Sequence, residues 1–464
     1  MSDTDRGVLA PPGIFKAYDI RGIHGEEMDR TTANAIGRAF VRVLARLREK
    51  PAGELRIGLG RDMRLTAPEM AAELRDGMIF EGATVLDAGM VATEMLYHLV
   101  GSRQLDGGAM CTASHNPKAY TGVKLVREGA LPLSGDAGIG DVKAEIEAGL
   151  GPAPGGGSFE EVDVWDEYSA HALSFVDAAA IKPMKVVVDG GNGMAGPMVG
   201  PILEQLPLEL EEMYFVPDGE FPDHEPNPLL EENRRMIIER VRESGADLGI
   251  AWDGDADRCF FIDATGTFCD GDFVCALLAR SILRKNPPGT TILYDPRSSR
   301  AVPDLVAAEG GRSDLSRVGH AFFKARMREE SAAFGGEVSG HYYFRDFWNA
   351  DTGTVPALLM LELLSLDGRS LAELMEEFRS RYFISGEINS EVDDQAAKLQ
   401  LIRERYGEGA EVSELDGVSV DHEDWHFNVR PSNTEPLLRL NLESLVSRED
   451  MEAKRDEVLG LIRS

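Results

Sequence analysis

The chain has 464 residues, of which 43% are hydrophobic, so it is long enough for three or four globular domains. Its net charge of −32 disfavours nucleic acid and anionic membranes as partners. No apolar run approaches the ~18 residues that cross a bilayer, and the acidic N-terminus lacks the apolar segment of a secretory signal. The four cysteines show no C-x-x-C spacing, which argues against a zinc site or a disulfide framework and favours a cytoplasmic protein.

One local pattern occurs three times along the chain. A short apolar run leads to an aspartate and is followed by a stretch of helical character, with runs at 55–60, 185–188 and 290–294 and helical stretches at 67–80, 195–206 and 300–308. Repeated strand, turn and helix units are typical of α/β domains with mostly parallel sheets. The sequence therefore predicts three related α/β domains with mixed, mostly parallel sheets.

The C-terminal part of the chain has a different pattern. Residues 425–430 and 437–442 are predicted to form two strands around a polar turn, and a helix is predicted to continue to the end. We therefore expect a C-terminal α+β domain. Composition changes at the glycine-rich stretch 149–157, just after residue 263 and near Arg379. These changes predict four domains, at 1–155, 156–263, 264–378 and 379–464.

Three acidic residues alternate in a loop after the apolar run 248–252: Asp253, Asp255 and Asp257. Carboxylates this close together repel one another unless a cation neutralises them, and they are suitable ligands for Mg²⁺ or Ca²⁺. An EF-hand is excluded, because its sixth position requires glycine and Arg258 occupies it here. The loop is predicted to bind a metal, with a solvated acidic turn as the alternative.

Ser114 lies between the apolar run that ends at Ala113 and the turn-forming pair Asn116-Pro117. It is predicted to lie on a turn at the end of a strand, as a nucleophile or, alternatively, as a helix N-cap. The chain has no G-x-S-x-G, which excludes a serine-hydrolase elbow. His115 is adjacent, although adjacency seldom gives the geometry of a base to a nucleophile.

Basic and polar residues elsewhere could bind phosphate and sugar. The turn that begins at Arg430 offers a guanidinium, hydroxyls, an amide and backbone N–H groups, all suited to a phosphate dianion. Glu337, Ser339 and His341 alternate, so an extended segment would place them on one face, where they could bind sugar hydroxyls. A solvated arginine and an ordinary polar loop are the respective alternatives. The chain has neither a nucleoside-triphosphate P-loop nor a dinucleotide fingerprint, so the glycine-rich turn 189–193 is interpreted as structural.

Taken together and in order, these motifs resemble the α-D-phosphohexomutase family, and within it the bacterial phosphomannomutase/phosphoglucomutase branch. The resemblance covers nearly the whole chain, from the stretch 15–22 through the Ser114 turn and the Asp253 loop to 336–341 and the Arg430 turn. It implies four domains around a central cleft. It also implies interconversion of mannose 6-phosphate and mannose 1-phosphate through a phosphoserine and a hexose 1,6-bisphosphate, with glucose or glucosamine phosphates as alternative substrates.

The resemblance also assigns roles to residues. It implies that Ser114 carries the phosphoryl group and that Mg²⁺ is bound by this phosphate with Asp253, Asp255 and Asp257. The implied catalytic contacts, for proton transfer and charge stabilisation, are Arg21, His115, Lys124 and His320. The implied substrate contacts are Arg258, Arg297 and Lys324, a sugar-specificity loop of Glu337, Ser339 and His341, and a distal phosphate clamp of Arg430, Ser432, Asn433 and Thr434.

The chain departs from the family pattern at three places. Thr121 stands where the family often has asparagine, Ala256 where it often has glycine, and Thr93-Glu94 where many members have Thr-Pro. None of these departures removes an implied catalytic group, and the third is expected to alter a turn slightly.

Two other functions remain open from the sequence. A metal-dependent phosphatase would use Ser114 and the Asp253 loop but release phosphate to water, and a sugar-phosphate sensor would bind without catalysis. A separate distal clamp favours the mutase, because a phosphatase has to hold only one phosphate. We expect hexose phosphates as the only partners and a monomer, with a dimer as the alternative.

Overall fold

The computed structural model describes residues 10–17, 19–134, 138–432 and 437–464. Within it the chain forms two compact units, one of residues 1–268 with 341–368 and one of 269–340 with 369–464. Each unit is described by itself below. No helix of the described chain has the length and apolar character needed to cross a membrane.

The first sheet of unit 1 is mixed and has the strand order β1-β5-β4-β2-β3-β7, with β6 on β5. Strands β2, β3, β4 and β7 run parallel to one another, whereas β5 is antiparallel to β1, β4 and β6. The strands are β1 (Ile20–Ile23), β2 (Arg56–Arg61), β3 (Thr84–Met90), β4 (Gly107–Cys111), β5 (Tyr120–Arg127), β6 (Leu131–Pro132) and β7 (Ser158–Glu161), and the helices are α1 (Arg30–Arg48), α2 (Ala67–Phe80), α3 (Thr93–Ser102) and α4 (Gly140–Glu147).

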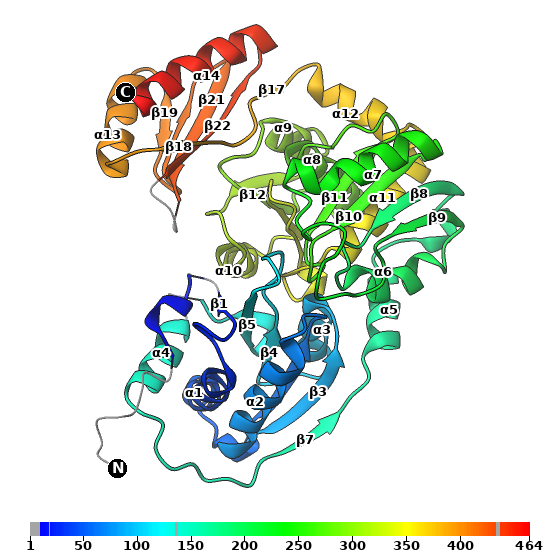
Figure 1. Cartoon of the computed structure of the whole chain (residues 1–464). Helices are drawn as coiled ribbons and strands as arrows, with labels where there is room; N and C mark the ends of the chain where they lie inside the picture. Colours follow the sequence, from blue (N-terminus) through cyan, green and yellow to red (C-terminus); the bar gives the residue numbers. More distant parts are fainter. Residues whose placement is uncertain (1–9, 18, 135–137, 433–436) are drawn as a thin grey trace. The chain divides into compact units, whose positions relative to one another are not determined.

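Helices α1 and α2 lie side by side against this sheet (Figure 1), and two glycines allow their close contact. A Cβ on Gly37 would lie 2.2 Å from the Leu74 carbonyl oxygen, and one on Gly77 would lie 2.3 Å from that of Asn34. Any larger residue at either position would push the helices apart, because interiors are close-packed.

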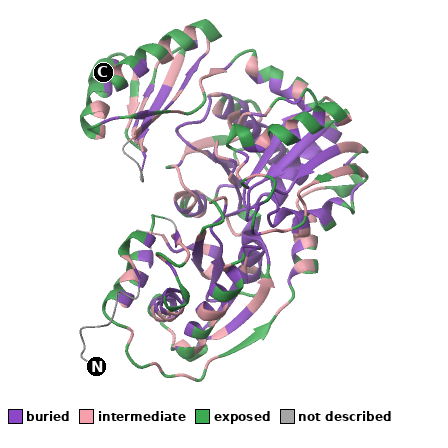
Figure 2. Cartoon of the chain, viewed as in Figure 1, coloured by how far each residue is buried: buried purple, intermediate pink, exposed green. Residues whose placement is uncertain are grey.

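The second sheet of unit 1 has the order β11-β10-β8-β9 and carries the acidic loop. Strands β8 (Met184–Asp189), β9 (Leu208–Met213) and β10 (Leu248–Trp252) are parallel, and β11 (Cys259–Asp263) returns antiparallel to β10. Every residue of β10 and β11 is buried, as Figure 2 shows for the centre of this sheet. The unit also contains α5 (Trp165–Leu173), α6 (Ala195–Leu203), α7 (Glu231–Ser244), β15 (Tyr342–Phe344), β16 (Ala350–Asp351) and α11 (Thr354–Asp367).

Unit 2 contains a parallel group of strands and an antiparallel sheet. Strand β12 (Thr291–Tyr294) pairs in parallel with β13 (Arg312–Leu315) and β14 (Phe334–Gly336). The helices that follow in the same part of the chain are α8 (Gly271–Lys285), α9 (Ala301–Ala308), α10 (His320–Glu330) and α12 (Leu371–Arg379). Helix α12 begins with the capping box of Ser370 and Glu373.

The antiparallel sheet has the order β17-β22-β21-β20-β19, with β18 on β22. Its strands are β17 (Phe383–Ile384), β18 (Ile388–Glu391), β19 (Glu411–Ser413), β20 (Val418–Asp421), β21 (Trp425–Pro431) and β22 (Leu437–Ser444), accompanied by α13 (Gln395–Tyr406) and α14 (Arg448–Arg463). The prediction of α/β domains with mixed sheets followed by an α+β part is confirmed.

The three predicted strand–helix pairs correspond to β2 with α2, β8 with α6 and β12 with α9.

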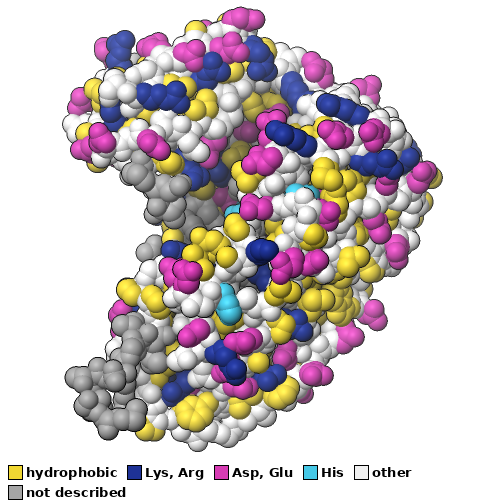
Figure 3. All heavy atoms as spheres, viewed as in Figure 1, with side chains coloured by type: hydrophobic (Ala, Val, Ile, Leu, Met, Phe, Trp, Pro, Cys, Tyr) yellow, Lys and Arg dark blue, Asp and Glu magenta, His cyan; other side chains and the backbone are white. Residues whose placement is uncertain are grey.

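On the face shown in Figure 3, acidic side chains are scattered among basic ones instead of gathering in one patch. The excess of negative charge on this face is therefore spread over a solvated surface.

Candidate active site

The acidic loop joins the antiparallel strands β10 and β11 of unit 1. Asp253 and Asp255 are completely buried and Asp257 is 2% exposed, with donor atoms of all three within 4.8 Å of one another. Three buried carboxylates so close together are stable only with cations beside them. The loop therefore differs from the solvated acidic turn that was the alternative.

Two cationic side chains contact these carboxylates. Lys124 Nζ on β5 donates to Oδ2 of Asp255 at 2.6 Å and to Oδ2 of Asp257 at 2.5 Å. Arg258 Nε donates to Asp253 Oδ2 at 2.8 Å. Burial would lower the pKa of Lys124, but the two carboxylates raise it well above its usual value, so the lysine is charged.

The same contacts separate the pKa values of the aspartates. Burial would raise the pKa of Asp255, but the Lys124 ammonium holds it well below its ordinary value. Burial raises the pKa of Asp253 to about 7, against the charge of Arg258 and with the help of the neighbouring acids. When all three aspartates are ionised, the charges of Lys124 and Arg258 leave one negative charge unbalanced, which a bound cation would offset.

The donor set fits a divalent metal. Within the described chain, Oδ1 of Asp255 and Oδ1 of Asp257 accept no hydrogen bond although both residues are buried. Buried acceptors without donors are costly, and carboxylate oxygens are the ligands that Mg²⁺ prefers. The three aspartates could thus hold a metal ion.

Ser114 lies on a turn after β4, as predicted, and no helix begins there, so the N-cap alternative is wrong. Its Oγ donates to Asp253 Oδ2 at 3.1 Å and lies 3.2 Å from Nδ1 of His115. The side chain of Ser114 is thus directed at the metal loop. A Cβ on Gly254 would lie 2.6 Å from the Ser114 carbonyl oxygen, so the close approach of the two loops requires glycine.

His115 and Arg21 flank the Ser114 turn. The imidazole of His115 is within hydrogen-bond reach of Ser114 Oγ, which sequence adjacency alone did not predict. Burial, aided by the charges of Arg258 and Arg21, lowers the pKa of His115 well below its usual value, so the ring is neutral. Arg21 on β1 donates from NH1 to Asn116 Oδ1 at 2.5 Å and pairs with Asp19.

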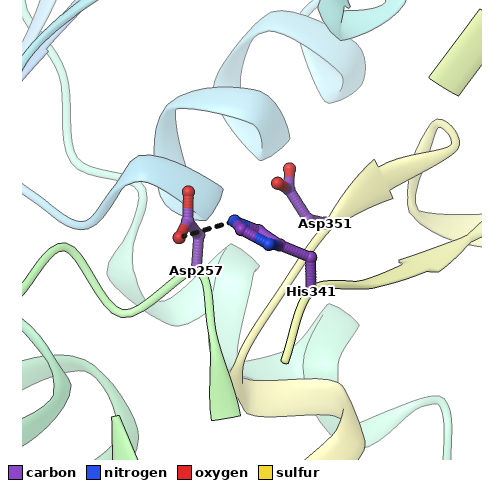
Figure 4. Close-up of side chains that lie close together, drawn as sticks. All are labelled: Asp257, His341 and Asp351. Carbon is purple, nitrogen blue, oxygen red and sulfur yellow. Dashed lines mark ion pairs between the residues drawn. The ribbon is translucent and has the colours of Figure 1, made fainter. Parts of the chain in front are cut away.

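His341 lies beside the metal loop in unit 1. Its Nε2 is 3.8 Å from Asp257 Oδ1, and its backbone bridges to that of Arg258. Figure 4 shows the ring between Asp257 and Asp351, and donor atoms of the three residues lie within 4.8 Å of one another. Asp351 is 1% exposed and comes from the end of β16.

Glu337 and Ser339 belong to unit 2, in contrast to His341. Strand β14 ends at Gly336, and residues 337–340 form a turn in which the Gly340 N–H donates to the Glu337 carbonyl at 3.1 Å. The expectation of an extended segment with three side chains on one face is therefore wrong, because the turn redirects the chain. Glu337 is 2% exposed and accepts from the Gly319 N–H at 2.8 Å.

Arg297 lies beside this turn of unit 2, and two further predicted residues are on α10. Arg297 donates to both carboxylate oxygens of Asp295, at 2.9 and 2.8 Å, and its NH2 lies 3.5 Å from Glu337 Oε1. Burial would lower the pKa of Arg297, but Asp295 raises it. His320 is the first residue of α10, next to Gly319, and Lys324 is fully buried one turn further along the helix.

Arg430 is 8% exposed near the end of β21, where three guanidiniums converge on one carboxylate. Glu387 lies 3.3 Å from Arg430, 3.3 Å from Arg439 and 3.8 Å from Arg297. Burial and the neighbouring charge of Arg297 lower the pKa of Arg430. Clustered guanidiniums with forked donors suit the binding of a phosphate.

Two other members of the predicted clamp lie outside the described residues. Ser432 is buried just after β21, whereas Asn433 and Thr434 are not described. The structure thus brings most of the predicted residues into two groups. One contains Ser114, Arg21, His115, Lys124, the three aspartates, Arg258 and His341. The other contains Arg297, Glu337 and Arg430, which are linked through Arg297 and Glu387, and His320, Lys324, Ser339 and Ser432 belong to the same compact unit.

Comparisons with known protein families account for nearly the whole chain. The profile of phosphoglucomutase/phosphomannomutase alpha/beta/alpha domain I matches residues 12–149, domain II matches 166–266, domain III matches 270–382, and the C-terminal domain matches 387–461. The chain belongs to the phosphoglucomutase/phosphomannomutase family. Membership makes it a phosphohexose mutase, an enzyme of the isomerase class.

Relatives within the family are similar over almost their full length. A phosphomannomutase of Salmonella montevideo is 44% identical over 459 residues, covering 97% of this chain and 99% of the relative. The phosphohexose mutases of Xanthomonas campestris pv. campestris are 43% identical over 452 residues, with the same coverage. A crystal structure of a family protein from Burkholderia thailandensis superposes with a TM-score of 0.87 at 32% identity, covering 97% of each chain.

The family is metal-dependent, and the buried aspartates of this chain are a suitable site for the metal.

The sequence did not reveal some residues that support this metal site. Thr93 Oγ1 donates to Asp255 Oδ2 at 2.5 Å, and Asp351 lies beside His341. For Thr93 no signal was present, since the family pattern also has threonine there and the departure lies at Glu94. No local sequence motif pointed to Asp351 or Glu387.

Proposed function

We propose that this enzyme interconverts mannose 6-phosphate and mannose 1-phosphate through a phosphoserine at Ser114 and a hexose 1,6-bisphosphate. The observation that carries the proposal is the contact of Ser114 Oγ with Asp253 in a buried triad of acids that Lys124 also contacts. The names of relatives at 41–44% identity support mannose as the sugar. A glucose phosphate is the second candidate, because relatives at 43% identity are named phosphohexose mutases.

In the first half-reaction, the bond between phosphorus and Ser114 Oγ breaks while a hydroxyl of the substrate bonds to phosphorus. The hydroxyl proton passes to a neighbouring base, and Ser114 Oγ is left as the leaving group between Asp253 and His115. The neutral imidazole of His115 can accept or return a proton at this oxygen. Mg²⁺ bound by Asp253, Asp255 and Asp257 would offset charge on the transferring group.

Lys124 and Arg258 hold the aspartates in place and add positive charge beside the phosphoryl group. We assign Arg21 to the same charge-stabilising group. In the reverse half-reaction the other phosphate of the bisphosphate returns to Ser114. This scheme requires a second site that accepts the phosphate at position 1 or at position 6.

We assign this second site to Arg430, Ser432, Asn433 and Thr434, supported by the guanidiniums that converge on Glu387. The substrate contacts are assigned to Arg297 and Lys324 and the sugar-specificity residues to Glu337, Ser339 and His341, while His320 is assigned a catalytic contact. Four domains with the limits given above, a monomer and a cytoplasmic location complete the proposal.

Replacement of Ser114 by alanine tests the central role. We expect Ser114→Ala to fold and to lose mutase turnover with mannose 1-phosphate, and near-native turnover would refute the assignment.

Phosphate release measured beside isomer formation separates a mutase from a phosphatase. Mass spectrometry after incubation with glucose 1,6-bisphosphate tests the sensor alternative, which predicts no phosphate on Ser114. Kinetics on mannose, glucose and glucosamine 1-phosphates determine the sugar.

A further inference from the structure

The Ser114 turn is held by a side chain that carries no role so far, Arg64, which lies between β2 and α2. Its guanidinium donates to four backbone carbonyl oxygens of the turn. NH2 donates to Ser114 at 2.7 Å and to Asn116 at 2.6 Å, and NH1 donates to Pro117 at 3.1 Å and to Tyr120 at 3.2 Å. Converging carbonyls repel one another, and a planar cation with forked donors neutralises them at fixed positions.

The conformation of Ser114 needs such support. Its φ is +49°, in the left-handed region that costs an L-residue roughly 1–2 kcal/mol. A strained residue keeps its conformation only where the surroundings determine it. The Ser114 N–H donates to Thr112 Oγ1 at 2.9 Å, while Arg64 holds the carbonyl on the other side of the same residue.

Arg64 is itself fixed from two directions. Its side chain is 2% exposed, its Nε lies 3.3 Å from Asp62 Oδ2, and its own N–H donates to Asp62 Oδ1 at 3.0 Å. The ring of Phe221 faces the guanidinium at 5.3 Å from its centroid. A Cβ on Gly219 would lie 3.0 Å from Arg64 Cα, so this segment of the chain packs directly on the arginine.

We propose that Arg64 is a positioning residue, which fixes the Ser114 turn so that Oγ is directed at the metal loop in both half-reactions. The inference rests on the proposed function of Ser114. Lysine at this position would keep the charge but not the fork, since an ammonium cannot reach four carbonyls in one plane. The Ser114 turn would then relax, and a displacement of the reacting atom by 1 Å costs on the order of 100-fold in rate.

The main test is Arg64→Lys, with Arg242→Lys as the matched control. Arg242 also holds carbonyls of a turn in unit 1, from Nε to Thr265 at 2.9 Å and from NH2 to Gly266 at 3.0 Å. Arg64→Lys is expected to lower kcat for mannose 1-phosphate about 100-fold with KM unchanged. Arg242→Lys is expected to leave kcat at the native value. A loss confined to KM, or equal losses in both variants, would overturn the inference.

A second readout is the single-turnover rate at which dephosphorylated enzyme takes a phosphoryl group from glucose 1,6-bisphosphate, followed by intact mass. This rate is expected to fall with kcat in Arg64→Lys, and a native rate would contradict the positioning role. If Arg64→Lys does not fold, Phe221→Leu loosens the same guanidinium and is expected to lower this rate by a smaller factor. An unchanged rate in a folded Phe221→Leu would then count against the inference.

Failure of the inference is distinguishable from failure of the proposed function. If Ser114→Ala is inactive while Arg64→Lys keeps the native kcat, only the role of Arg64 is refuted. If Ser114→Ala keeps turnover, the phosphoserine mechanism itself is refuted.

Discussion

Replacement of Glu94 by glutamine tests whether its carboxyl group is protonated in the folded enzyme. Glu94 is fully buried at the start of α3, where Oε1 accepts from Thr354 Oγ1 at 2.9 Å. Burial raises its pKa to about 8, against hydrogen bonds from Thr352, Tyr168 and Thr354. The sequence showed only a departure from Thr-Pro at this position, whereas the structure shows a buried acid.

The magnitude follows from the two pKa values. The ordinary pKa is 4.5 and the folded value is about 8, so the unfolded chain releases this proton at a lower pH than the folded one. The free energy of unfolding therefore falls as the pH rises from 4.5 to 8, by about 5 kcal/mol in total. Glutamine has a similar shape to the neutral acid and does not titrate. The stability of Glu94→Gln relative to native should thus rise by this amount over the same range.

Urea unfolding followed by tryptophan fluorescence measures the effect, because three of the four tryptophans, Trp165, Trp252 and Trp348, lie in the same compact unit as Glu94. The control is Glu239→Gln, at an exposed position of α7 in the same unit. Native and variant are compared at pH 5, 7 and 8.5 without metal. A difference in unfolding free energy that does not change with pH would refute the reasoning, as would an equal change in Glu239→Gln.

Three other replacements have definite expected outcomes. Lys124→Met removes the ammonium between two aspartates, so kcat should fall by about 100-fold or more. The increase in melting temperature on adding Mg²⁺ should become larger, because the carboxylates keep more uncompensated negative charge. No change in either quantity would contradict the role of Lys124 in balancing the charge of the aspartates. Gly254→Ala places a Cβ 2.6 Å from the Ser114 carbonyl, so turnover should be lost, whereas Gly460→Ala, in open space, should be neutral. Glu387→Gln removes the negative charge that Arg430 and Arg439 contact at 3.3 Å, so the KM for hexose phosphates should fall at low salt, and a higher KM would refute competition between Glu387 and the phosphate.

The amino-acid sequence by itself determined the local elements. Alternation of apolar runs with helical stretches predicted β2, β8 and β12 with the helices that follow them, because each pattern depends only on neighbours along the chain. The acidic loop was recognisable for the same reason, since its three carboxylates come from one short segment. The family followed from the order of such motifs.

Only the tertiary structure decided which of these segments meet. Ser114 and Asp253 are 139 residues apart and lie 3.1 Å apart in space because the turn after β4 and the loop between β10 and β11 approach each other. His341 and Glu337, four positions apart, belong to different compact units, and a turn lies between them. No local pattern encodes such proximities, since they depend on how whole sheets pack.

The same reason explains the residues that the sequence did not reveal. Arg64 and Glu94 carry no motif, and their importance comes from burial beside carbonyls or hydroxyls of distant segments. A buried charge or acid is costly unless its partners are placed for it. The sequence thus determined which groups are present near the chemistry, and the packing of the chain decided which of them are positioned to act.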